Sequence, residues 1–188
     1  MKKTLMLLVV VACCLALGAR ADARIPEKLK VTTNTPIETP GKIALPAGTY
    51  VFKRLDLPSG FDIVQIFNED ETQLLNTVIG IADYKEEPPE HAMISLYETE
   101  PENPPALHAL FFPGDRIGIE FVYPKDRAME LSKQTGKNVM AGQTATAKNP
   151  SVQPTSDELT EMQRQIVTAV TPDGRSISIV EARKASEN

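Results

Sequence analysis

Cysteine is almost absent from this chain of 188 residues, because the only two, Cys13 and Cys14, stand side by side near its start. The rest of the sequence therefore offers no disulfide, no thiol nucleophile and no thiolate metal site. Positive charge is also in the minority, since 20 Lys and Arg residues face 25 Asp and Glu residues. An acidic chain has no general attraction to nucleic acid, which we exclude as a partner.

Sequence signatures of catalysis and metal binding are missing as well. The chain has no G-x-S-x-G elbow for a serine nucleophile and no H-E-x-x-H pair for zinc. Its two histidines, His91 and His108, are far apart in sequence, and the carboxylates considered with them are Glu90 and Glu98. We therefore predict no metal, cofactor or catalytic residue, and keep a hydrolase with an unrecognised carboxylate or histidine site as the alternative.

Residues 1–21 have the three parts of a secretory signal peptide. A basic start is followed by the apolar run Thr4–Leu17 and then by Ala19-Arg20-Ala21, which matches the A-x-A pattern of signal peptidase sites. The apolar run is too short to cross a membrane comfortably. Cleavage after Ala21 predicts an exported protein that begins at Asp22 and is periplasmic or extracellular, with no transmembrane span in the mature chain.

A lipoprotein is the second interpretation of the same segment. Val10-Val11-Ala12-Cys13 loosely matches a lipoprotein box, in which Cys13 would be lipidated and would tether the domain to a membrane surface. The apolar run continues past Cys13, which favours ordinary cleavage. Without residues 1–21, 17 basic and 25 acidic residues remain, a formal charge of −8.

The central part of the chain alternates between apolar and polar residues as β-strands do. All ten aromatic residues lie between Tyr50 and Tyr123, which places the core in this region. Turns rich in Pro and Gly separate the apolar stretches. The pattern predicts a mainly β domain over residues 22–140, an antiparallel sandwich or a small barrel. Its expected strands are residues 32–40, 49–55, 62–68, 73–84, 92–99, 107–112 and 117–123.

The chain after the last strand is predicted to hold a short helix and a separate tail. Pro124 suits the first turn of a helix over residues 125–135, and Gly136 suits its end. Residues 141–155 are small and polar, which predicts a flexible linker. Residues 156–188 are predicted to form a small helix and hairpin segment, weakly ordered, whose helix begins with a capping box at Thr155.

Three aromatic residues at predicted strand ends form a candidate ligand-contact surface. Phe111, Phe112 and Tyr123 each stand beside a turn, and exposed rings stack on sugars or fill a groove of a partner protein. The other interpretation is that the three rings close the end of the domain.

Three strings carry a resemblance to known proteins: LPAGTYVFKRLD, DIVQIFNEDETQLLNTVIGI and FFPGDRIGIEFVYPK. Together they resemble a group of small exported β-domain proteins of soil bacteria that has no assigned activity. The resemblance covers residues 30–135 and leaves out the tail. It implies export and a single β-domain, and it implies no catalytic residue.

These observations predict an exported, non-catalytic protein of the cell envelope or the medium that binds a ligand. An envelope protein or a glycan is the expected partner.

Overall fold

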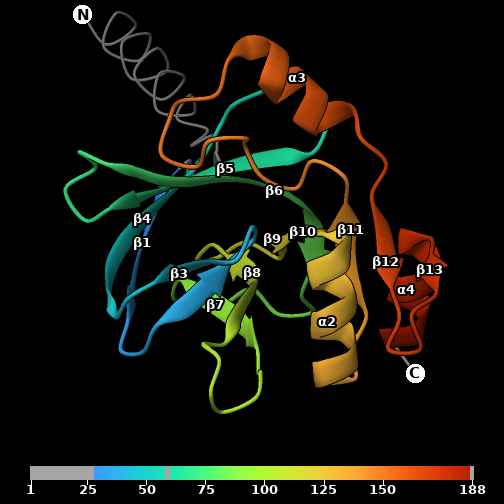
Figure 1. Ribbon diagram of the computed structural model, residues 1–188. Helices are drawn as coiled ribbons and strands as arrows, with labels where there is room; N and C mark the ends of the chain where they lie inside the picture. The colour runs from blue at the N-terminus through green and yellow to red at the C-terminus, as the bar shows by residue number, and fades with distance from the viewer. Residues whose placement is uncertain (1–27, 58–59, 187–188) are drawn as a thin grey trace, which may run out of the picture.

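The computed structural model describes residues 28–57 and 60–186, so the predicted signal peptide and Cys13 lie outside the described residues. Within them the chain is built mainly from β-strands (Figure 1). This confirms the predicted fold class. The strands of the larger sheet are β1 (Lys28–Thr33), β2 (Ile37–Thr39), β3 (Ile43–Leu45), β4 (Gly48–Arg54), β5 (Asp62–Asn68), β6 (Leu74–Tyr84), β7 (Met93–Tyr97), β8 (Ala106–Phe111) and β9 (Ile117–Phe121).

The larger sheet bends around a first hydrophobic core. Its strand order is β1-β4-β5-β6-β9-β8-β2-β3, and β7 pairs with β8 beside this path. The bend brings β7 and β8 across from β4 and β5, as the ribbon shows (Figure 1). Alternate residues of each strand point inward, so rings such as Phe52 and Phe121 meet in the middle, 6.5 Å apart.

A smaller sheet and three helices complete the described residues. Its strands are β10 (Tyr123–Pro124), β11 (Val139–Gly142), β12 (Thr168–Val170) and β13 (Ser176–Ile177), paired in that order. The helices are α2 (Lys125–Thr135), α3 (Ser156–Arg164) and α4 (Ile179–Ser186).

Helix α2 has the predicted bounds, because local signals fix both of its ends. Pro124 precedes it with φ −55°, and Gly136 ends it in the left-handed conformation with φ 67°. One face of α2 packs on the first core through Ala128 and Leu131. Arg127 fastens the same helix to β2, since its guanidinium donates two hydrogen bonds of 2.7 Å to the carboxylate of Glu38.

The structure contradicts the predicted flexible linker over residues 141–155. Its first residues belong to β11, and the next ones pair with β6 through hydrogen bonds of 3.0 Å from Ile79 N to Ala145 O and 2.9 Å from Ala147 N to Thr77 O. Near the end of the segment, the Gln153 side chain accepts a hydrogen bond from buried Gln65. The small polar side chains that suggested a linker instead allow the backbone to lie close against the sheet.

The tail beyond residue 155 is not a loosely attached end, because it covers the outer face of β5 and β6 (Figure 1). Thr155 accepts a hydrogen bond from the backbone N–H of Glu158, as half of the predicted capping box requires. Met162 of α3 is fully buried. A second core results, with the buried members Ile63, Ile79, Ile81, Val122, Met140, Ala145, Ala147, Met162, Val167, Ala169 and Ala182.

Gly118 of β9 is a position where no larger residue fits. A Cβ atom there would lie 2.4 Å from Phe111 Cδ1 and 2.6 Å from Leu110 O. We expect Gly118→Ala to lower the free energy of unfolding by about 3 kcal/mol or more, because β9 would have to move away from β8. Urea unfolding measures this loss.

Gly114→Ala is the matched control for Gly118→Ala. Gly114 has φ 76°, but a Cβ atom there would have no neighbour within 4 Å. Gly114→Ala should therefore lower the free energy of unfolding only by the cost of an alanine in the left-handed conformation, about 1–2 kcal/mol. Equal losses in the two variants would contradict the tight approach of β8 and β9.

Candidate functional site

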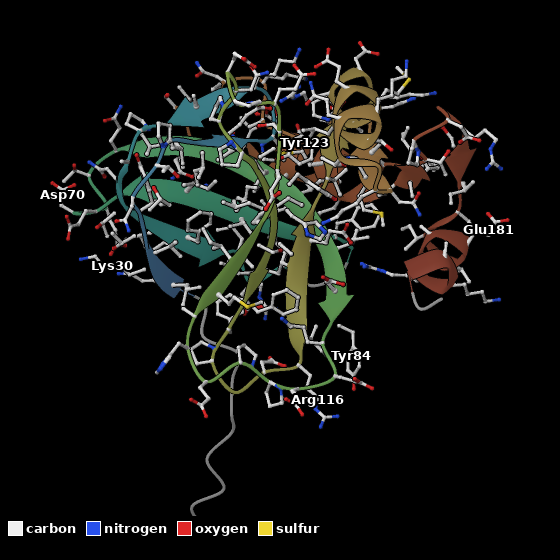
Figure 2. All side chains as sticks on the ribbon, turned by 90° about the horizontal axis from the view of Figure 1, so that it is seen from below. Lys30, Asp70, Tyr84, Arg116, Tyr123 and Glu181 are labelled. Carbon is white, nitrogen blue, oxygen red and sulfur yellow. The ribbon has the colours of Figure 1, made fainter. Side chains whose placement is uncertain are left out.

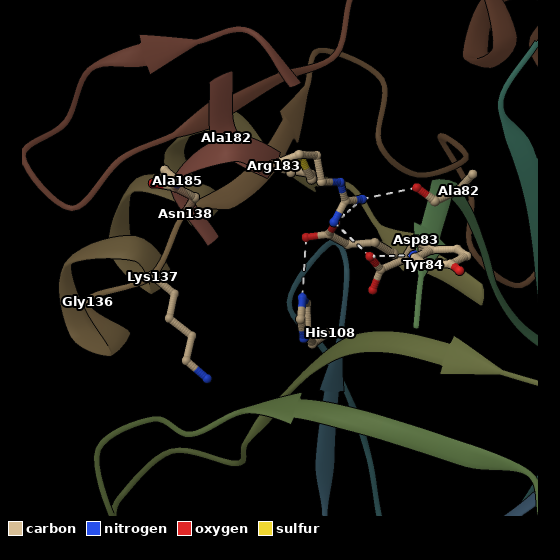
Figure 3. Close-up of a pocket in the computed structure, with 12 residues that line it drawn as sticks. Ala82, Asp83, Tyr84, His108, Gly136, Lys137, Asn138, Ala182, Arg183 and Ala185 are labelled. Atoms are coloured by element: carbon tan, nitrogen blue, oxygen red, sulfur yellow. Dashed lines mark hydrogen bonds and ion pairs between the residues drawn. The ribbon is translucent and has the colours of Figure 1, made fainter. Parts of the chain in front are cut away.

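The structure contains a cavity of about 870 Å³, lined by polar and apolar residues, where the larger sheet meets the last helix. The close-up shows its residues converging from several elements (Figure 3). They come from the end of β6, from β8 and β9, from the turn after α2, from β11 and from α4. The lining residues are Ala82, Asp83, Tyr84, His108, Glu120, Gly136, Lys137, Asn138, Met140, Ala182, Arg183 and Ala185.

Glu120 is the central group of the site. Because side chains alternate along β9, Ile119 and Phe121 point into the first core and Glu120 points to the opposite face. The residue is only 2% exposed. A buried carboxylate needs hydrogen bonds and a compensating cation, so the neighbours of Glu120 decide whether its charge is tolerated.

Both oxygens of Glu120 have neighbours. The Tyr97 hydroxyl lies 3.4 Å from Oε1 and donates to it, and His108 Nε2 lies 3.3 Å from the same oxygen. Arg183 Nη2 lies 2.6 Å from Oε2 as an ion pair, although this oxygen has no partner with hydrogen-bond geometry. The compensating cation thus comes from α4, 63 residues further along the chain.

Arg183 contacts two further acceptors on β6. Its Nη1 donates to Asp83 Oδ1 over 2.7 Å, and its Nη2 donates to the Ala82 carbonyl oxygen over 3.0 Å (Figure 3). The guanidinium therefore lies among three oxygens that belong to neighbouring strands. These contacts hold α4 against the edge of the cavity.

His108 joins Glu120 to a serine. The Ser95 hydroxyl lies 3.1 Å from His108 Nδ1, so the two ring nitrogens contact Ser95 and Glu120 respectively. The imidazole also packs against the Tyr97 ring, with 4.3 Å between the ring centroids. This packing fixes the orientation of the imidazole.

Tyr97 is a donor at every pH near neutrality. Burial raises the pKa of its hydroxyl well above the ordinary value of 10.0, and the negative charge of Glu120 raises it further. Burial also raises the pKa of Tyr123, whose hydroxyl donates a 2.7 Å hydrogen bond to the Leu107 carbonyl oxygen. The folded protein therefore keeps both phenols protonated at a pH where the unfolded chain ionises them.

We expect this difference to destabilise the protein in alkali. The stabilising contribution of each phenol is fully present below about pH 10, and is lost at about 1.4 kcal/mol per pH unit above that value. The variant Tyr97→Phe/Tyr123→Phe should therefore lose stability less steeply than the unaltered protein between pH 9 and 11. Urea unfolding across this range measures both slopes.

Tyr84→Phe is the control, because Tyr84 is 63% exposed. The unfolding free energy of Tyr84→Phe should fall with pH as steeply as that of the unaltered protein. Parallel slopes for all three proteins would contradict the role of the buried phenols.

The structure separates most of the residues that the sequence singled out. His91 is exposed in a loop, as are Glu90 and Glu98, and none of them lines the cavity. His108 does line it. Across residues 28–57 and 60–186, no group of three or more His, Cys, Asp or Glu side chains is placed to hold a metal ion.

The predicted ligand-contact surface does not exist as a surface. Phe111, Phe112 and Tyr123 are 3%, 1% and 0% exposed, so their rings are core residues. Phe112 and Tyr123 belong to the first core. Phe111 lies close to Gly118 of β9, and the Tyr123 ring lies 6.4 Å from the ring of Tyr97, so proximity to a turn in the sequence did not place these rings in solvent.

The acidic hairpin between β5 and β6 lies on the side of the molecule away from α4, as the positions of Asp70 and Glu181 show (Figure 2). Its carboxylates have partners within or beside the hairpin. Glu71 contacts Lys28 and lies 2.8 Å from Lys53, and Asp70 accepts a 2.8 Å hydrogen bond from Thr72. These groups stabilise the hairpin and take no part in the cavity.

Glu120, Arg183 and Lys137 are not among the residues predicted from the sequence. One signal for Glu120 was present, since it is the single charged residue in the apolar strand IGIEFVY. A charge in a strand with two buried faces indicates a paired or functional group. No local pattern pointed to Arg183, because its partners are about 60 or more residues away.

Comparison of the chain with protein-family models, curated protein sequences and solved structures finds no match in any of the three. The resemblance to exported soil-bacterial proteins therefore stays a prediction. Among the residues that the structure describes, none of the helices is both long and apolar enough to span a membrane.

Proposed function

We propose that this chain is an exported binding protein that takes a small polar ligand into the cavity around Glu120. The observation that carries the proposal is the convergence of His108, Glu120, Lys137 and Arg183 on one hollow of about 870 Å³. Cavities of roughly 300–1,000 Å³ with a few convergent polar groups are typical of small-ligand sites.

Lys137 is the group best placed to contact a ligand. It follows the C-terminal end of α2, and its side chain extends into the cavity (Figure 3). Within the described part of the chain, the Lys137 ammonium has no salt bridge or side-chain hydrogen bond. A cation without a protein partner is free to bind an acceptor group of a ligand.

Export rests on the sequence of residues 1–21, and the acidic charge supports a partner other than nucleic acid. The site that we propose is a cavity, which favours a small ligand such as a sugar unit of an envelope glycan. A tether through Cys13 stays the alternative arrangement at the membrane.

A thermal-shift screen of the purified exported protein tests the proposal. The panel holds sugars, amino acids, organic acids and polyamines, and each hit is then titrated by calorimetry. Lys137→Gln and His108→Gln should each weaken the binding of a hit that carries a carboxylate or another acceptor group by about tenfold or more, since a hydrogen bond to a charged group contributes about 1.5–3 kcal/mol.

Lys133→Gln is the matched control, because Lys133 is exposed on the same helix end and does not line the cavity. It should bind each hit as the unaltered protein does. A panel without hits, or hits that bind all three variants equally well, would refute the cavity as the binding site.

A hydrolase is the second candidate function, favoured by the contacts from Ser95 through His108 to Glu120. In such a step the Ser95 oxygen bonds to the carbonyl carbon of an ester while its proton passes to His108 Nδ1. The alcohol leaves with that proton, and water then releases the acid by the same route. Glu120 would orient the imidazole through Nε2–H.

A fluorophosphonate probe tests this second candidate, because it bonds covalently to activated serine hydroxyls. Intact mass should show one adduct on the unaltered protein and on Ser176→Ala, an exposed control on β13. Ser95→Ala and His108→Gln should show none. An unlabelled native protein would leave binding as the only function of the site.

A further inference from the structure

The three acceptor groups around Arg183, here called the receptor, all belong to the larger β-sheet. Asp83 and the Ala82 carbonyl group lie on β6, and Glu120 lies on β9. The two strands are paired, with Asp83 opposite Gly118 and Ile81 opposite Glu120. Backbone pairing therefore places the three groups side by side without α4. Contacts from Tyr97 and His108 orient the Glu120 carboxylate, and the Tyr84 N–H donates to Asp83 Oδ1, so the acceptors are preorganised and bind a partner at a reduced ordering cost.

The group that fills this receptor comes from a weakly anchored element. Helix α4 has only eight residues and lies at the far end of the described chain. Ala182 is buried in the second core and the half-buried Ile179 packs against it, whereas Val180 is 64% exposed and Glu181 and Lys184 are exposed as well. A short helix with a single fully buried side chain opens at a lower free energy than the sheet beneath it.

The receptor requires a cation, and its geometry suits a guanidinium group. Without Arg183, the buried charge of Glu120 would have only the Tyr97 and His108 contacts. A planar guanidinium presents several donors at fixed angles to two carboxylates and a carbonyl, whereas an ammonium group is a compact point charge. The acidic charge of the whole chain, −5, adds a general attraction for cationic ligands.

We propose that this site binds the guanidinium group of a ligand, and that Arg183 occupies it in the absence of that ligand. The inference rests on the proposed function of the cavity and names the ligand class. The ligand enters the cavity beside α4, its guanidinium replaces that of Arg183 between Asp83 and Glu120, and α4 moves away from the sheet.

Competition with Arg183 sets the expected affinities. A tethered side chain acts as a competitor at an effective concentration of the order of millimolar. The apparent dissociation constant of a ligand therefore rises by the inverse of the fraction of open sites. Agmatine, a small guanidinium compound, should bind Arg183→Ala at least about tenfold more tightly than it binds the unaltered protein.

Titration of Arg183→Ala with agmatine and with putrescine is the first arm of the test. Putrescine lacks the guanidinium group and should bind at least about tenfold more weakly than agmatine. The double variant Glu120→Gln/Arg183→Ala should lose agmatine binding, whereas Arg175→Ala, which removes an exposed arginine, should behave as the unaltered protein. If Arg183→Ala does not fold, Arg183→Gln takes its place, because its amide still donates to Glu120.

The second arm follows the Arg183 Nε–H resonance in the full, unaltered protein by NMR. Saturating agmatine, or a peptide with a central arginine, should shift this resonance to that of a free arginine side chain. A resonance that stays unchanged at saturation, even with binding to Arg183→Ala, would show a structural ion pair only and overturn the proposal. A peptide that displaces Arg183 where agmatine does not would identify a protein partner as the source of the guanidinium.

A second copy of this chain that exchanges α4 is one more source of the guanidinium group. The size of the protein in solution tests for this source. A concentration-dependent dimer lost in Arg183→Ala would make that copy the ligand. The two proposals also fail separately. Hits in the thermal-shift screen without guanidinium binding would refute only the inference. A panel without hits, together with displacement of Arg183 by the arginine peptide in the native protein, would refute only the proposed binding of a small ligand.

Discussion

Arg127→Met is expected to lower the free energy of unfolding by about 3–5 kcal/mol, because it leaves the Glu38 carboxylate buried without its cation. Glu38 is 8% exposed, and both of its oxygens accept hydrogen bonds of 2.7 Å from the guanidinium. The pair joins α2 to β2, so its loss also loosens the helix that carries the end of the cavity. Urea unfolding followed by circular dichroism measures the change.

Two further variants test the cause of this loss. Glu38→Leu/Arg127→Met removes both charges and should recover much of the stability, since an apolar pair often replaces a buried ion pair without cost. Lys42→Met breaks an exposed ion pair with Glu130 and should change the free energy of unfolding by less than about 1 kcal/mol. A double variant as unstable as Arg127→Met would point to lost packing rather than an unpaired charge.

Deletion of residues 155–188 is expected to prevent the β-domain from folding as a stable monomer. The deletion uncovers Ile63, Ile79 and Ile81 on the outer face of β5 and β6, and it removes β12, the partner of β11. Exposed apolar patches of this kind cause aggregation. Light scattering and the loss of a cooperative urea transition measure the effect.

Single substitutions in the tail give the matched comparison. Met162→Ala should cost about 2–5 kcal/mol, because the Met162 side chain is fully buried in the second core. Ile166→Ala should cost less than about 0.5 kcal/mol, since Ile166 is 82% exposed. A shortened chain that unfolds at an unchanged urea concentration would show that the tail is a separate unit.

Local sequence signals predicted the elements that local physics determines. Residues 62–68 form a largely apolar stretch between two predicted turns and are β5, and the Pro124 and Gly136 signals bound α2 at the residues where it begins and ends. The mainly β fold class is confirmed for the same reason. Period-two alternation and turn residues act within a few positions of one another, so the sequence displays them directly.

Signals that depend on the rest of the fold were misinterpreted. Residues 141–155 have a linker-like composition, yet their backbone completes the edge of β6 that β9 leaves open at Thr77 and Ile79. Composition indicates whether side chains are apolar enough to join a core. Residues 141–155 attach to the sheet through backbone hydrogen bonds instead. The sequence left two interpretations for Phe111 and Phe112, a ligand-contact surface or closure of the domain end, because no local pattern reveals which elements pack over a strand end.

The site could not be predicted from any short stretch of sequence. Its acceptors lie at residues 82, 83 and 120, and the cation that satisfies them is Arg183. Only the pairing of β6 with β9 and the return of the tail across the sheet bring these groups together. The lone carboxylate in an apolar strand was the one local indication that a partner had to exist.

Because the tail covers β5 and β6, the second core is completed only after the last residues of the tail have been synthesised. A ribosome makes the strands of residues 62–84 about 100 residues before it makes Ala182, the last buried residue of the second core. At about 5–20 residues per second, the outer face of these strands waits roughly 5–20 s for its cover. The apolar outer face of β5 and β6 therefore stays uncovered until the last helix has been made.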